Sequence, residues 1–485
     1  MLKSHDQMWT RLSQLHKDIP LWVAGRIAGG AAAPTSITTA ATSGARARSH
    51  NGGAQNTTPT DMGDAADMGD TARTSRLAHF DALQEVDPDT ASLAESLLIP
   101  ICGDCPDTSS RHALQDKGQF LARQERWSEL SQLIRAADQK RACTPGGLPE
   151  ADLLAYGARA DVINAVEHAL EERSNKPDSA AENRILIDGV MALETLRCEH
   201  RQDSHLTALV ALAHIDIAWI WRSTAPQIAT SQACADSHLR RASAHFERAA
   251  ALLEPLKDQS KDSAFLSAAH CALFAGQTAN TLKVADAFGA LIDKDPGNPR
   301  PMRALGVQML PRANGSYAAL ELEARRTAVR TRQEWGAGGY TWVYFDAMAM
   351  DEQACERVDT KFFLDGLQDI LRTDPSQEMV NLLSAYCAVS LRHGGSGNEQ
   401  AEQTRRKISE AAGWLIRGHL RELHPLIWAH ACEGFDNSAR VTSLRRFAAH
   451  GQAAALRSIA GIFRDEIDSG HKIAFTPEGI DLVSG

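Results

Sequence analysis

Apolar residues recur at helical spacing over most of this chain, and strand-like alternation is nearly absent. The pattern is clearest between Asp236 and Lys257, where apolar side chains fall on one stripe and the arginines lie elsewhere. A helix that packs one face against a neighbour has such a stripe. The stripe consists of Leu239, Ala242, Phe246, Ala249, Leu253 and Leu256. We therefore expect stacked helices, and not sheets, from about residue 76 to residue 470.

Aspartate-proline turns separate several of the expected helices. Asp295-Pro296 and Asp374-Pro375 each follow a helical pattern rich in alanine and leucine and precede another. Proline fits the first turn of a helix, where its missing N–H has no intrahelical partner, and the aspartate before it can cap. Helical pairs joined in this way predict an all-α fold, a right-handed α-solenoid of degenerate tetratricopeptide-like helical pairs.

The chain divides into five regions by its pattern of apolar residues. Residues 1–24 predict a short amphipathic N-terminal helix. Residues 25–75 contain mainly Ala, Gly, Thr, Ser and Asp, so they cannot bury enough apolar area to fold and are expected to form a disordered linker. The remaining expectations are an N-terminal helical region at 76–200, a tetratricopeptide-like repeat core at 201–395, and C-terminal helices and a tail at 396–485.

Composition and charge limit the class of protein. The net charge of -10 is spread along the 485 residues without a block of Lys or Arg, so nucleic acid is not an expected partner. The nine cysteines are an odd number and stand mostly alone in apolar segments, which indicates reduced thiols. The chain has neither an apolar run long enough to span a bilayer nor a secretory signal at its start. We expect a cytoplasmic protein without a membrane partner.

Two motifs stand apart within the helical patterns. The first is Ala211-Leu-Ala-His-Ile-Asp-Ile-Ala-Trp-Ile-Trp-Arg222, and the second is Met309-Leu-Pro-Arg-Ala-Asn-Gly-Ser316. In the second motif Pro311 ends one helix, the Asn-Gly pair permits positive φ, and Ser316 offers its hydroxyl to the next helix. The second motif therefore predicts a corner between two helices.

Together the two motifs resemble a family of bacterial tetratricopeptide-like helical-repeat proteins whose molecular role is unassigned. The shared patterns are His-Ile-Asp-x-Ala-Trp-x-x-Arg and Leu-Pro-Arg-x-x-Gly-Ser, and the resemblance extends over roughly residues 150–390. The family usually has Leu-Pro-Arg-Trp-Gly-Gly-Ser where this chain has Leu310-Pro-Arg-Ala-Asn-Gly-Ser316. The tryptophan is missing here, and with it any stacking role of that ring.

A helical array of this kind favours a binding function over catalysis. Its concave groove suits a protein or peptide partner, so the favoured function is a cytoplasmic interaction scaffold with no catalytic residues and no cofactor. The residues expected to line the groove are His214, Asp216, Trp219, Arg222 and Arg312. Asp216 and Arg312 carry opposite charges in apolar contexts, where an unpaired charge is costly, so we expect them to face each other.

Two alternative functions stay open for the same residues. His214-Ile-Asp216 and the tryptophans after it resemble the His-x-Asp metal motif of class II α-mannosidases, which implies a zinc-dependent glycoside hydrolase. Residues two apart on a helix point about 200° apart and cannot chelate one ion, so no metal site is predicted here. The other alternative is a helical sensor that binds a small ligand near Arg222 and Arg312.

A cysteine pair near the start of the helical region has redox or metal spacing. The motif is Cys102-Gly-Asp-Cys105, with His112 and Cys143 downstream. A zinc site of this type needs a second well-spaced pair, and a thioredoxin-like site needs a neighbouring strand-helix unit. Neither is present in the sequence pattern, so these are expected to be ordinary turn cysteines.

Overall fold

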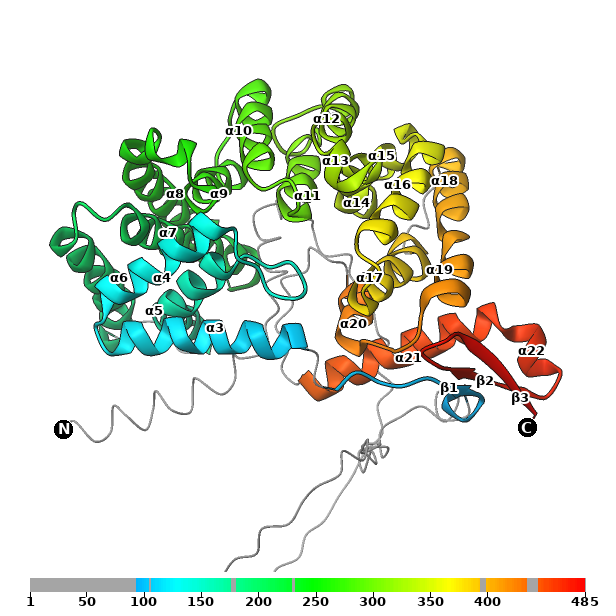
Figure 1. Ribbon diagram of the computed structural model, residues 1–485. Helices are drawn as coiled ribbons and strands as arrows, with labels where there is room; N and C mark the ends of the chain where they lie inside the picture. The colour runs from blue at the N-terminus through cyan, green and yellow to red at the C-terminus, as the bar shows by residue number, and fades with distance from the viewer. Residues whose placement is uncertain are drawn as a thin grey trace, which may run out of the picture. The chain divides into compact units, whose positions relative to one another are not determined.

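The structure is a computed structural model, and most of the chain it describes is helical (Figure 1). This confirms the all-α class. The predicted helix at 1–24 and linker at 25–75 lie outside the described residues. The described parts of the three later regions belong to one compact unit. The described residues are 93–103, 106–175, 180–228, 232–392, 398–433 and 444–484.

A first group of helices surrounds α7 (Ser204–Ile228), which contacts α4, α5, α6, α8 and α9. Its sequence is apolar nearly all round, as expected for a helix enclosed by neighbours. By length and composition, Ser204–Ser223 also suits a membrane span, which the sequence analysis did not foresee, but 89% of this stretch is buried inside the protein. The other helices of the group are α3 (Pro106–Arg123), α4 (Trp127–Lys140), α5 (Glu150–Asn175), α6 (Ala180–Glu199), α8 (Gln232–Leu253) and α9 (Ala264–Ala272).

A second group of helices includes α14 (Gly338–Met350), most of whose side chains are buried. It contacts α11, α12 and α16. The other helices are α10 (Thr281–Lys294), α11 (Pro299–Gln308), α12 (Tyr317–Arg330), α13 (Arg332–Trp335), α15 (Glu352–Arg357), α16 (Thr360–Thr373), α17 (Gln377–Ala388), α18 (Glu399–Ser409), α19 (Ala411–His419), α20 (Pro425–Glu433), α21 (Leu444–Ile462) and α22 (Arg464–Asp468). Short 3₁₀ turns lie at Glu254–Leu256, Gln259–Lys261, Leu273–Ala275 and Ser390–Arg392.

The most extensive helix contacts join elements that are close in the sequence. Examples are α3 with α5, α7 with α8, α11 with α14, and α20 with α21. Neighbour contacts of this kind are typical of repeat proteins. The right-handed solenoid of tetratricopeptide-like pairs stays a prediction, because neighbour contacts fix neither the handedness nor the repeat.

A small sheet joins the two ends of the described chain (Figure 1). β1 (Leu97–Leu98) pairs in parallel with β2 (His471–Phe475), which pairs antiparallel with β3 (Ile480–Ser484). Leu97 lies opposite Ile473, and both side chains are buried. The sequence analysis expected only helices and a tail here, because the partner of β2 lies at the other end of the chain, where no local pattern announces it.

The predicted Asp-Pro turns separate helices, but other residues cap the helices that follow. At the start of α11, Asn298 Oδ1 accepts the backbone N–H of Arg300 at 3.1 Å. At the start of α17, Ser376 Oγ accepts the backbone N–H of Met379 at 3.2 Å. Pro299, and not the proline of the Asp295-Pro motif, occupies the first turn of α11. Each turn therefore runs further than predicted before the next helix begins.

The second motif forms the predicted corner between α11 and α12. Ser316 Oγ caps α12 by accepting a backbone N–H at 3.2 Å. The expected positive φ is wrong, because among the described residues it occurs only at other positions. Glycine is needed at position 315 because the backbone of Met309 passes close by. A Cβ at this position would lie 2.2 Å from the Met309 carbonyl oxygen.

Asn314 fastens this corner to the connection between α9 and α10. Its Oδ1 accepts the backbone N–H of Ala279 at 2.9 Å. Its Nδ2 donates to the Phe274 carbonyl at 3.1 Å and to Gln308 Oε1 at 2.8 Å. The asparagine, which stands where the resembling family has glycine, therefore has a structural role in this chain.

The contact between α3 and α5 depends on two glycines. A Cβ at Gly157 would lie 1.9 Å from the Gln115 carbonyl oxygen, and one at Gly118 would lie 2.1 Å from that of Leu154. We expect Gly157→Ala to lower the free energy of unfolding by about 1 to 3 kcal/mol, because the helices must separate. Chemical denaturation measures the change.

The matched control for this variant is Gly413→Ala in α19. A Cβ at Gly413 meets nothing within 4 Å. Only helix propensity then acts, so stability should rise by about 0.5 to 1 kcal/mol. If both variants respond alike, the close approach of α3 and α5 has no energetic role.

Candidate functional site

A cavity of about 330 Å³ lies where the two helix groups meet. Its lining comes from α4, α5, α7 and α9 of the first group and from α10, α11 and α14 of the second. Most of the lining is apolar, but five aspartate and four arginine side chains also reach it. A cavity of this size with a few polar groups is typical of ligand sites.

An ion pair between α5 and α7 forms part of the wall. Arg159 Nε donates to Asp216 Oδ2 at 2.7 Å. The Arg159 side chain is only 9% exposed, and its guanidinium also lies 5.4 Å from the centre of the Tyr156 ring. Asp216 therefore neutralises a buried arginine.

Two buried donors on this wall have no hydrogen-bond partner among the described residues. They are Arg159 Nη1 and Trp219 Nε1. Trp219 is 6% exposed, and its ring packs edge-on against Phe246 and lies 5.3 Å from the Arg222 guanidinium. An unsatisfied buried donor costs about 1 to 3 kcal/mol. Both residues belong to the cavity lining, so a ligand there lies close to these donors.

A second ion pair links the two helix groups across the cavity. Arg300 Nη1 on α11 lies 3.4 Å from Asp152 Oδ2 on α5. Burial raises the pKa of Asp152 despite the opposing charge of Arg300, and burial likewise lowers the pKa of Arg300. Burial therefore disfavours the charged form of each group, although the two charges attract each other.

A third carboxylate of the lining, Asp295, forms no ion pair among the described residues. Asn298 Nδ2 donates to its Oδ2 at 3.1 Å. Burial nevertheless raises the pKa of Asp295. A carboxylate in this state gains from any cation that approaches it, because the cation favours the charged form.

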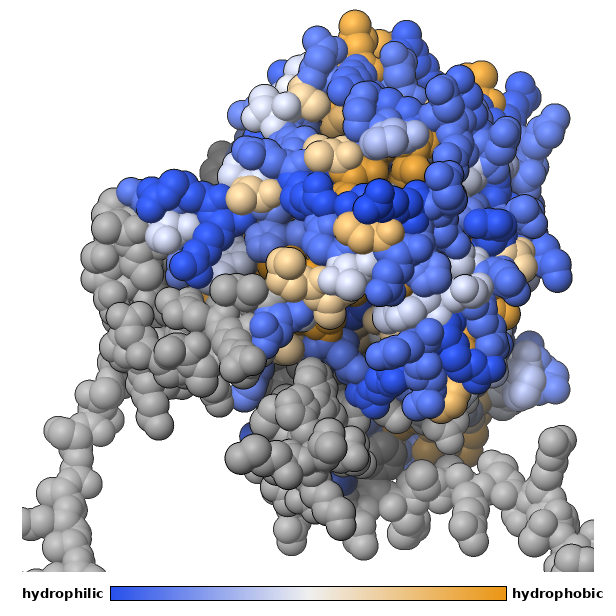
Figure 2. Space-filling model, turned by 90° about the vertical axis from the view of Figure 1, so that its left-hand side faces the viewer, coloured by the Kyte–Doolittle hydropathy of each residue, from blue (hydrophilic) through white to orange (hydrophobic). Residues whose placement is uncertain are grey.

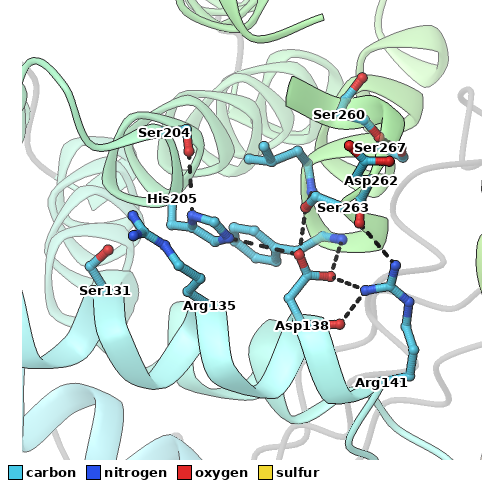
Figure 3. Close-up of polar contacts among 12 residues, drawn as sticks. Ser131, Arg135, Asp138, Arg141, Ser204, His205, Ser260, Asp262, Ser263 and Ser267 are labelled. Atoms are coloured by element: carbon cyan, nitrogen blue, oxygen red, sulfur yellow. Dashed lines mark hydrogen bonds and ion pairs between the residues drawn. The ribbon is translucent and has the colours of Figure 1, made fainter. Parts of the chain in front are cut away.

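Asp138 holds together the part of the wall where α4, α7 and α9 meet (Figure 3). Ser263 Oγ donates to it at 2.5 Å, the Phe265 N–H at 3.0 Å and Arg141 Nη1 at 2.8 Å. Burial raises the pKa of Asp138, but contacts with His205, Ser263 and Phe265 outweigh it and lower the pKa overall. Asp138 is therefore a charged acceptor that anchors the start of α9.

Ser204, His205 and Asp138 lie next to one another in space in the order of a catalytic triad (Figure 3). The sequence analysis did not predict this set. Ser204 Oγ is 3.4 Å from His205 Nδ1, and His205 Nε2 is 3.7 Å from Asp138 Oδ2. Both separations exceed the roughly 3.2 Å expected for a catalytic relay, and Ser204 is buried. The set links α7 to α4 and has a structural role.

His214 points away from the cavity. Its Nδ1 lies 2.8 Å from His245 Nδ1 on α8, and its Nε2 lies 3.1 Å from Glu194 Oε1 on α6. Arg248 donates twice to Glu194, at 2.6 Å each. Since Asp216 faces Arg159 instead, His214 and Asp216 do not share a side of α7. In this arrangement the two side chains do not converge on one ion-binding position.

The structure brings together only part of the predicted groove. Asp216 and Trp219 line the cavity, and Arg222 lies against the Trp219 ring but is not part of the lining. Arg312 is exposed in the corner and is not part of the lining. The predicted pairing of Asp216 with Arg312 is wrong, because Asp216 is paired with Arg159.

The sequence analysis missed the other charged residues of the cavity. Arg159, Asp152 and Asp346 each interrupt an otherwise apolar or small-residue stretch of a helix. That interruption was the available signal. It identifies a buried charge, but not the helix from which its partner comes.

The described outer surface on the side of α6 and α8 is seen in Figure 2. Figure 2 shows this face as mostly hydrophilic, with apolar side chains in small separate areas. The cavity, with its charged and apolar lining, is the candidate site among the described residues. Comparison of the chain with protein-family models, with curated proteins and with solved structures found no match.

Proposed function

We propose that the cavity binds a peptide segment that carries an apolar side chain and a positive charge, and that the protein is a binding scaffold and not an enzyme. The observation that carries the proposal is the pair of unsatisfied donors, Arg159 Nη1 and Trp219 Nε1, on the cavity wall. Peptide carbonyls supply such acceptors without adding charge.

The charges of the lining favour this ligand over an anion. Asp216 already neutralises Arg159, so the acceptor that completes the guanidinium need not be charged. Carboxylates outnumber guanidinium groups in the lining, and Asp295 has no ion pair among the described residues. A lysine, an arginine or a free amino terminus of the peptide is a suitable partner for Asp295. The apolar walls accommodate the adjoining side chain.

The wider expectations from the sequence form part of the same proposal. We propose a right-handed array of tetratricopeptide-like pairs, related to the bacterial family that the motifs resemble, and the contacts between neighbouring helices support it. A cytoplasmic location is supported by seven described cysteines that stand outside any disulfide.

Selection from a random peptide library tests the proposal. We expect enrichment of peptides that combine an apolar residue with a positive charge. Each selected peptide is then measured by calorimetry with a free and with an acetylated amino terminus, which shows which group supplies the charge. Failure to enrich any peptide that binds saturably contradicts the proposal.

Two conservative variants locate the binding. Trp219→Phe keeps the ring but removes the N–H, and Arg159→Lys keeps the charge beside Asp216 but removes Nη1. Each should weaken binding by about 5- to 100-fold, which corresponds to about 1 to 3 kcal/mol for one buried hydrogen bond. Trp342→Phe is the matched control, since Trp342 Nε1 is also buried without a partner among the described residues but lies outside this cavity. Equal losses in all three variants rule out the cavity as the site.

A further inference from the structure

Three metal-ligating side chains from distant parts of the chain meet outside the cavity. The ligand atoms of Cys102, Glu422 and His424 all lie within 4.8 Å of one another. His424 Nε2 is 3.0 Å from Glu422 Oε1. The cysteine precedes α3, whereas the other two residues lie between α19 and α20. Their meeting is therefore a product of the tertiary fold and not of sequence proximity.

Backbone hydrogen bonds fix the two segments that carry these side chains. The Cys102 N–H donates to the Leu423 carbonyl and the Leu423 N–H donates to the Pro100 carbonyl, each at 2.8 Å. Ile101 and Leu423 are thereby bridged in parallel. Side chains alternate between the two sides of extended backbone. Leu423 points into the core, so its two neighbours and Cys102 share the opposite side.

The segment of Glu422 and His424 is also held by α17. The His424 N–H donates to Asn381 Oδ1 at 3.0 Å, and the Glu422 N–H donates to Gln377 Oε1 at 3.2 Å. The His424 side chain is 9% exposed and that of Glu422 is 40% exposed. The ligand set is therefore anchored at the backbone and reachable from solvent on the side of the carboxylate.

The chemistry of the three side chains fits zinc. Thiolate, imidazole and carboxylate all bind Zn²⁺, at roughly 2.0 to 2.3 Å, so ligand atoms of a tetrahedral site lie roughly 3.5 Å apart. The three ligand atoms, all within 4.8 Å of one another, lie near that spacing. Three protein ligands leave one position open for water, as in zinc sites that act on or bind a further molecule.

We propose that Cys102, Glu422 and His424 bind one Zn²⁺ ion, with water as the fourth ligand. The site is separate from the peptide-binding cavity, because none of its three residues belongs to the cavity lining. By joining the segment before α3 to the segment before α20, the ion clamps the beginning of the described chain to its C-terminal part. Because the two sites share no residues, the test of metal binding and the test of peptide binding can fail separately.

Titration of the chelator-treated full chain with Co²⁺ alone tests the site. We expect one equivalent to bind, with a thiolate-to-cobalt charge-transfer band, and Zn²⁺ to displace it. Cys102→Ser should abolish the band, and Glu422→Gln should weaken binding on the order of a hundredfold or more, since even changing a residue that only hydrogen-bonds to a metal ligand costs 10- to 100-fold. Changing Glu422 disturbs the fold less than changing His424, because the Glu422 side chain is the more exposed of the two.

Two controls decide how a loss is interpreted. Cys198→Ser removes an exposed thiol elsewhere and should leave the band intact. Thermal unfolding in chelator should be the same for wild type and Glu422→Gln, whereas added Zn²⁺ should raise the melting temperature of the wild type only. A protein that binds no equivalent of Co²⁺, or a band that survives in Cys102→Ser, overturns the proposal.

Discussion

Replacement of Arg303 by methionine is expected to lower the free energy of unfolding by about 3 to 5 kcal/mol. Arg303 Nε and Nη2 donate to the two carboxylate oxygens of Asp346, at 2.9 Å and 2.7 Å. The two side chains are only 9% and 16% exposed, so the variant leaves a nearly buried carboxylate without its partner. Urea denaturation measures the loss, with the midpoint and the slope compared between variants.

Two further variants separate the lost partner from lost packing. The double variant Arg303→Met/Asp346→Leu removes both charges and should recover most of the stability, because no charge is then left buried. Arg372→Met breaks the ion pair between Arg372 and Asp369. The Arg372 side chain is 73% exposed, so this variant should lower the free energy of unfolding by less than about 1 kcal/mol. A cost for Arg303→Met no larger than that for Arg372→Met shows that Asp346 does not depend on its partner.

Acidification is expected to destabilise the protein between about pH 6.5 and pH 4. Burial lowers the pKa of His245 to about 4, helped by His214 and Arg241. Burial likewise lowers the pKa of His430 to about 4, helped by Arg111. In the unfolded chain a histidine has a pKa of about 6.5, so the unfolded state binds more protons in this window. The free energy of unfolding therefore decreases as the pH is lowered, by up to roughly 3 kcal/mol for each histidine.

Unfolding measured at several pH values checks this dependence. His430→Gln should flatten it, whereas His450→Gln, which changes an exposed histidine of α21, should not. Glu194 acts in a different window: hydrogen bonds from Arg248 lower its pKa to about 2, so its contribution is complete above about pH 4.5 and is lost only below that. If the stability is the same at pH 7 and pH 5, the prediction is wrong, because folding then does not lower the pKa of His245 or His430.

Local periodicity was sufficient to predict the helices but not the exact faces that they bury. The stripe between Asp236 and Lys257 corresponds to α8, which ends at Leu253 before the Pro255 turn. Phe246 and Leu253 of the stripe are buried, whereas Leu239 is 46% exposed. Periodicity shows which residues share a side of a helix. Whether a neighbour covers the whole of that side depends on the tertiary packing.

The cavity could be predicted only in part, because its charged residues find partners far away in the sequence. Asp216 is 57 residues from Arg159, and Asp346 is 43 residues from Arg303. The first motif led to Asp216 and Trp219, which do line the cavity. The same helical geometry that excluded chelation by His214 and Asp216 also explains why the histidine points to the other side.

The pairing of β1 with β2 has a consequence for the time course of biosynthesis. Leu97 and Leu98 are made before any of the helices from α3 to α22, whereas their partners Ile473 and Ala474 are made after all of them. At about 5 to 20 residues per second, β1 waits for its partner for tens of seconds. During that interval the helices can form as they emerge, but the strand exposes unpaired backbone and a leucine pair. β1 therefore stays without its partner strand until the last part of the chain has been made, which favours late closure of the sheet.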